Sequence, residues 1–144
     1  MRFLAHEYLR VVLVNTNRSS SKLVSVSQGT LNEALAHPRE IFKPVIFFSA
    51  FAFLMVHNHP NGAPSPFEAD LRLTRRILAA SKVLQLQLID HVIIGSPAPG
   101  RNSYFSFKEE GLFRKAWRAV VLDPDEPSNG VLEDRSIKPL SCPN

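Results

Sequence analysis

Short apolar runs separated by polar turns dominate the first two thirds of this chain. Residues 51–56 are rich in aromatic and branched side chains and too few to cross a membrane, so they predict a buried strand. Four other runs have strand-like patterns bounded by Gly, Pro, Ser or Asn. The expected strands are 8–15, 22–28, 51–56, 87–94 and 104–107, with a proline-rich loop at 96–100.

The clearest helical pattern lies at 66–84, where apolar residues recur three or four positions apart. We expect Ser65 to be the N-cap, with Pro66 at the first helical position and Glu68 closing a capping box. The helix should bury one face and leave its arginines largely in solvent. The expected buried residues are Ala69, Leu73, Ile77, Ala80 and Leu84, and the arginines are Arg72, Arg75 and Arg76.

Two further segments complete the expected fold. A helical segment should follow Gly29 and Thr30, and a helix starting at His37 and Pro38 should be kinked or shortened by Pro44, which lacks an N–H donor. Strands and helices that alternate, with hairpins at both ends, predict a mixed sheet covered on both faces. The predicted fold class is therefore α/β, a three-layer α/β/α sandwich.

Composition fits a single globular domain with a tail. The chain has 144 residues, of which 44% are hydrophobic, which is enough for one core and too little for two domains. Residues 113–144 are rich in Pro, Asp and Ser and predict an irregular tail. Trp117 could anchor that tail or contact a second copy, so a homodimer is one expected assembly.

Several classes of protein are excluded or disfavoured by composition. We expect no membrane segment and no secretory leader at the N-terminus. The lone cysteine, Cys142, rules out an internal disulfide framework and favours the cytoplasm. The net charge of +4 and pI near 9.6 permit contact with nucleic acid, but no block of Lys and Arg forms a binding arm. The helical arginines are better explained as a solvated surface.

The chemistry of the chain is concentrated at His57, His59 and Asp70. Two histidines two positions apart on an extended backbone point to the same side. Asp70, expected in the second turn of its helix, can be folded back over the strand end. Two His and one Asp with an open fourth position form a catalytic type of zinc site, whereas structural sites are usually closed by four ligands. An isolated His-x-His pair, however, more often caps a loop or carries hydrogen bonds.

The complete string resolves this ambiguity. His57-x-His59, seven residues, position 67, two residues and Asp70 resemble the JAMM signature His-x-His-x7-Ser-x2-Asp of the JAB/MPN metalloprotease superfamily. The segment HNHPNGAPSP closely resembles the corresponding sequence of the bacterial RadC branch. The resemblance runs from Glu7 to Leu112, so we expect a RadC-like JAB/MPN metal-binding domain over 1–112, with a cytidine deaminase-like fold.

This resemblance implies a role for each residue of the metal site. His57, His59 and Asp70 would ligate zinc, with water as the fourth ligand, and an upstream glutamate would shuttle its proton. Glu7, at the start of the first strand, is the first choice for that base. Glu40 is the alternative, although a helix dipole and a cap already explain a carboxylate there. The implied activity is hydrolysis of a peptide or isopeptide bond in a peptide or protein substrate.

One position departs from the family pattern. Phe67 stands where the family has a serine that helps to hold the oxyanion, and phenylalanine cannot donate a hydrogen bond. A second function therefore stays open, a catalytically weak or inactive metal-binding module associated with DNA repair or mobile elements. RadC relatives commonly carry an N-terminal helix-hairpin-helix region, and we expect this chain to lack it. A zinc deaminase is excluded, because it needs a Cys-x-x-Cys pair.

A second polar pair, Asp90 and His91, lies inside a predicted strand. With apolar flanks, His91 is expected to be a hydrogen-bonded structural histidine rather than a ligand. Asp90 could orient one of the metal histidines, as zinc sites often require.

Overall fold

The computed structural model describes residues 5–16, 21–29 and 36–114. All five expected strands are present, with bounds shifted by a few residues. The strands are β1 (Glu7–Val14), β2 (Ser21–Gly29), β3 (Ala52–Asn58), β4 (Gln87–Ile94) and β5 (Tyr104–Ser106). The helices are α1 (Pro38–Phe47) and α2 (Glu68–Leu84).

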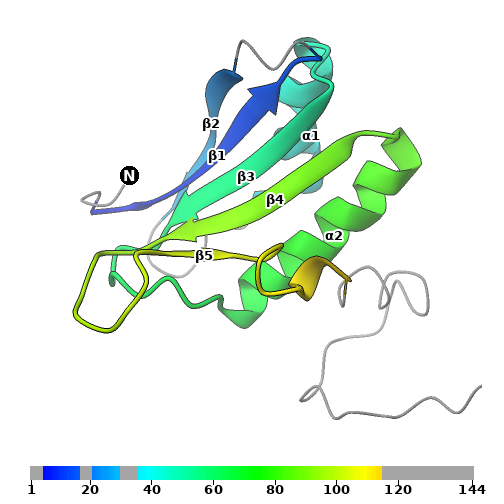
Figure 1. Ribbon diagram of the computed structural model, residues 1–144. Helices are drawn as coiled ribbons and strands as arrows, with labels where there is room; N and C mark the ends of the chain where they lie inside the picture. The colour runs from blue at the N-terminus through cyan, green and yellow to red at the C-terminus, as the bar shows by residue number, and fades with distance from the viewer. Residues whose placement is uncertain (1–4, 17–20, 30–35, 115–144) are drawn as a thin grey trace, which may run out of the picture.

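The strands form one mixed sheet in the order β2-β1-β3-β4-β5. Neighbouring strands are antiparallel except β3 and β4, which run parallel. A parallel pair needs a crossover connection, and α2 supplies it. The mixed-sheet α/β fold is therefore confirmed, and the carboxyl ends of β3 and β4 meet at one edge of the sheet (Figure 1).

Both helices pack on the same face of the sheet (Figure 1). They share one hydrophobic core with β1, β3 and β4. Its largest fully buried members include Phe53, Ile41, Met55 and Ile77. Across the described ranges, the helices thus form a single layer, and the second helical layer expected on the opposite face does not occur among those residues.

The helix starts and ends differ in part from expectation. α1 continues through Pro44 to Phe47, so it is not shortened there, because Ile41 and Val45 on either side are fully buried in the core. α2 begins at Glu68 with Phe67 as N-cap, so the prediction of Ser65 as N-cap was wrong. Leu84, at the end of α2, is exposed rather than buried.

Some predictions fall on residues that the structure does not describe. They are the helical segment after Gly29 and Thr30, the irregular tail beyond Arg114, and the role of Trp117. Among the described residues, no helix is both long and apolar enough to span a membrane.

Candidate metal centre

Two rows of inward-facing side chains end at the site. On β1 the buried row Leu13, Val11 and Leu9 leads to Glu7, which lies two residues before Leu9 and so faces the same side of the sheet. On β3 the residue paired with Leu9 is His57. Directly paired residues share a face, so His57 also points toward the helices. Core packing on two neighbouring strands therefore brings these two side chains together.

The loop after β3 fixes His59. The backbone N–H of His59 donates to the carbonyl of Ile94 on β4 over 3.0 Å, and its ring Nδ1 lies 2.8 Å from the carbonyl oxygen of Ala63. Gly62 has a φ of 79°, a conformation that glycine adopts readily. A Cβ on Gly95 would lie 2.5 Å from the Gly62 carbonyl oxygen, so the close approach of loop and strand also requires glycine there.

Asp70 is held at the N-terminus of α2. Its Oδ2 accepts a hydrogen bond from the backbone N–H of Phe67 over 2.7 Å. Asp70 thus lies in the first turn and caps the helix itself, which is why Ser65 is not needed for that role. The helix N-terminus favours a carboxylate at this position. Its other oxygen, Oδ1, faces His57.

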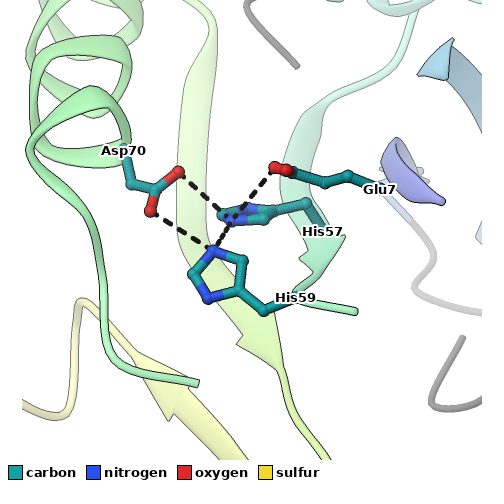
Figure 2. Close-up of side chains that lie close together, drawn as sticks. All are labelled: Glu7, His57, His59 and Asp70. Carbon is teal, nitrogen blue, oxygen red and sulfur yellow. Dashed lines mark hydrogen bonds and ion pairs between the residues drawn. The ribbon is translucent and has the colours of Figure 1, made fainter. Parts of the chain in front are cut away.

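Four side chains converge at this point (Figure 2). One ligand atom from each of Glu7, His57, His59 and Asp70 can be chosen so that all lie within 4.8 Å of one another. The Nε2 atoms of the two histidines are 3.0 Å apart, and they lie 3.2 and 3.4 Å from the two Asp70 oxygens. Ligands of one tetrahedral zinc lie about 3.3 Å from each other. The three separations are close to this value, although each histidine faces a different oxygen of Asp70.

Glu7 lies farther from the other three residues. Its Oε1 is 3.9 Å from His57 Nε2. Burial raises the pKa of Glu7, and the nearby His57 and His59 offset this only in part. In metal-free protein, Glu7 is therefore a buried carboxylate with an increased affinity for protons, and it lies beside the three closely spaced residues rather than among them.

The two histidines and Asp70 form a hydrogen-bonded network without any ion. Although burial opposes ionisation, hydrogen bonds from His57, His59 and the Phe67 N–H hold the pKa of Asp70 far below its usual range. Burial also opposes protonation of His59, but the Asp70 carboxylate and the Ala63 carbonyl raise its pKa overall. In metal-free protein, protons therefore compete for the atoms that would bind a metal.

These shifts predict how the stability of metal-free protein depends on pH. The lowered pKa of Asp70 stabilises the fold above about pH 4, and the raised pKa of His59 stabilises it fully below about pH 6.5. As the pH rises through the folded-state pKa of His59, that contribution is lost. We expect the Tm in excess chelator to fall as the pH rises above about 6.5, and to fall less in Asp70→Asn. Equal changes in both proteins would contradict the assignment.

The structure separates the two candidate bases. The carboxylate of Glu40 accepts a hydrogen bond from the backbone N–H of His37 over 3.3 Å and caps α1. Glu40 is not part of the converging group, whereas Glu7 is. The sequence analysis explained Glu40 as part of a helix cap, and the structure shows this cap.

The prediction that Asp90 orients a metal histidine was wrong. Its carboxylate accepts hydrogen bonds from the backbone N–H groups of His91 and Lys108 and from the Ser106 hydroxyl. The β3–β4 register shifts after Phe53, where one extra β4 residue is inserted. That bulge turns His91, rather than Asp90, toward the face that carries the site.

Asn58 is a supporting residue that the sequence did not reveal. Its side-chain oxygen accepts from the Tyr8 N–H, and its side-chain nitrogen donates to the His6 carbonyl, each over 3.0 Å. Asn58 therefore holds the backbone on both sides of Glu7. The only sequence signal was an asparagine between two histidines, and nothing in the local sequence identified its partners 50 and 52 residues away.

Comparison with known proteins agrees with this geometry. Residues 1–112 match the model of the RadC-like JAB domain family. A UPF0758 protein of Alkaliphilus metalliredigens is 41% identical over 112 residues, covering 78% of this chain and 46% of the relative. One from Chlorobium luteolum is 47% identical over 106 residues, covering 74% and 45%. This chain spans about half the length of the curated relatives that it matches. On the strength of these matches, the chain belongs to the RadC-like JAB domain family.

Proposed function

We propose that this domain is a zinc-dependent hydrolase that cleaves a peptide or isopeptide bond in a peptide or protein substrate. The observation that carries the proposal is the convergence of two imidazole Nε2 atoms and one carboxylate at tetrahedral spacing, with a second carboxylate beside them. A structural zinc site would normally be closed by four ligands. Here only three residues have that close spacing, and the Glu7 carboxylate beside them would serve as the base.

A bound zinc ion would supply Lewis acidity and lower the pKa of a water molecule near it. His57, His59 and Asp70 would hold the ion, each through an atom whose direction is already fixed by the fold. Glu7 would take a proton from the attacking water and return it to the leaving amine. Its position beside the three ligands, with Oε1 3.9 Å from His57 Nε2, suits both steps, because the same carboxylate must hold that proton between them.

Phe67 favours the second candidate function, a metal-binding module with weak or no catalysis. Its ring lies against His59, with ring centroids 4.7 Å apart, and its backbone N–H is already bonded to Asp70. Neither the side chain nor the backbone of Phe67 therefore offers a donor to an oxyanion. In such a module the site would bind metal, and the partner would be a protein or a nucleic acid.

A direct assay separates the two functions. Zinc-loaded protein would be incubated with quenched-fluorescence peptides and an isopeptide-linked pair, beside His57→Ala and a sample stripped with chelator. The hydrolase proposal expects cleavage only by the loaded, unsubstituted protein. If the protein bound zinc but never exceeded His57→Ala on any substrate, the binding-module function would replace it.

Phe67→Ser should raise turnover on a cleaved substrate by about tenfold or more, which is ~1.4 kcal/mol of barrier. The serine would restore a hydroxyl donor beside the site. Zinc affinity should stay nearly unchanged, because the Phe67 side chain makes no hydrogen bond to a ligand. Phe67→Ala is the matched control, since it removes the ring without adding a hydroxyl. Equal turnover in the serine and alanine variants would show that the missing hydroxyl is not the defect.

A further inference from the structure

A chain of buried polar groups runs from His57 away from the site. His57 Nδ1 lies 2.8 Å from His91 Nε2, and His91 Nδ1 lies 2.7 Å from the Thr74 hydroxyl oxygen. That hydroxyl donates to the backbone carbonyl of Asp70 over 2.6 Å. The chain therefore starts behind one proposed metal ligand and ends on the backbone of another.

The Thr74 end of this series of polar groups fixes the direction of every hydrogen bond in the series. The single Thr74 proton is given to the Asp70 carbonyl, so the Thr74 oxygen must accept from His91 Nδ1–H. Neutral His91 then has an unprotonated Nε2, which accepts from His57 Nδ1–H. In neutral His57, the proton on Nδ1 leaves the lone pair on Nε2, the atom that faces Asp70 and His59.

Packing holds His91 in the orientation that this requires. The ring is fully buried and stacks on Phe107, with centroids 4.7 Å apart and an interplanar angle of 13°. No carboxylate is among the hydrogen-bond partners of its ring in the described residues. A charged ring would be costly in such a place, and its Nε2–H would force the His57 proton onto the metal-facing nitrogen.

We propose that His91, held by Thr74, is a positioning residue that fixes the ring orientation and the Nδ1-protonated tautomer of His57. The inference rests on the proposed metal site, because only there does the free Nε2 have a use. Histidine ligands commonly donate their second N–H to an acceptor, and loss of that acceptor typically lowers metal affinity by about 10–100-fold. His59 has a backbone carbonyl in this role, whereas His57 depends on side chains alone.

Thr74→Val is the most discriminating variant, because it replaces the hydroxyl by a methyl group of similar size. Ser81→Ala is the matched control. Ser81 lies buried on the same helix, and its hydroxyl has no hydrogen-bond partner among the described residues. His91→Leu removes the acceptor itself, and Thr74→Ser restores the hydroxyl. Zinc affinity of the full chain would be measured by competition with a chromogenic chelator. The tautomer of His57 would be read from ¹⁵N shifts of metal-free protein at a pH where the imidazoles are neutral.

We expect His91→Leu to lower zinc affinity about 10–100-fold, with a smaller loss in Thr74→Val and near-normal binding in Thr74→Ser and Ser81→Ala. His57 should carry its proton on Nδ1 in the unsubstituted protein and shift toward Nε2 in the first two variants. Unchanged affinity and an unchanged tautomer in both would overturn the proposal.

Two other outcomes are also informative. If His91→Leu does not fold, Thr74→Val decides by the same two measurements. If the unsubstituted protein binds no zinc, the proposed function fails, and the His57 tautomer still tests whether His91 sets it.

Discussion

His59→Ala should lower the affinity for zinc by at least about 100-fold, because loss of a direct ligand costs more than loss of a group behind it. The three proposed ligands are spaced for one ion, and no other His or Cys among the described residues is part of the group. Elemental analysis of purified protein and a competition titration would measure the effect.

The control for this experiment is His37→Asn. His37 is an exposed N-cap of α1, and asparagine is also a good N-cap, so this variant removes a histidine without disturbing the site. His37→Asn should bind zinc normally. The same metal content in His59→Ala and the unsubstituted protein, both folded, would refute the site.

Glu7→Gln should lower the rate of hydrolysis by about 10²–10⁴-fold while leaving zinc affinity nearly unchanged. Glutamine keeps the shape of the side chain but cannot accept and return a proton. Because Glu7 Oε1 is 3.9 Å from His57 Nε2 and lies at the margin of the group, the ion would keep its three ligands. Single-turnover rates on a cleaved peptide and a zinc titration would give the two quantities.

Glu40→Gln is the matched control variant for this test, because it removes the other candidate carboxylate. Its side chain closes a capping box, and glutamine can fill that role as well as glutamate. Its rate should equal that of the unsubstituted protein. If Glu7→Gln lost zinc and activity together, Glu7 would be a ligand, and the base would have to be sought elsewhere.

Burial of Glu7 gives a pH signature in metal-free protein. Because burial raises the pKa of Glu7, its carboxyl group should titrate above the ordinary glutamate value of 4.5 in excess chelator. The carboxyl ¹³C shift followed against pH would measure this, and titration at or below 4.5 would contradict the buried position of the group.

The sequence by itself determined the strands, the long helix and the three converging residues. These follow from local periodicity: alternation places His57 and His59 on one side, and helical spacing places Asp70 near the start of α2. The HNHPNG string and its distance to Asp70 also established the family resemblance, which the match over residues 1–112 supports.

Only the tertiary structure decided which groups support those three residues. The register of β1 on β3 placed Glu7 rather than Glu40 beside His57, and one extra residue in β4 turned His91 inward in place of Asp90. Asp70 proved to cap its own helix through the N–H of Phe67. Strand register, a bulge and a cap depend on contacts between residues far apart or on competition between nearby donors. Local periodicity does not encode these, because shifting one residue reverses the face of every side chain after it.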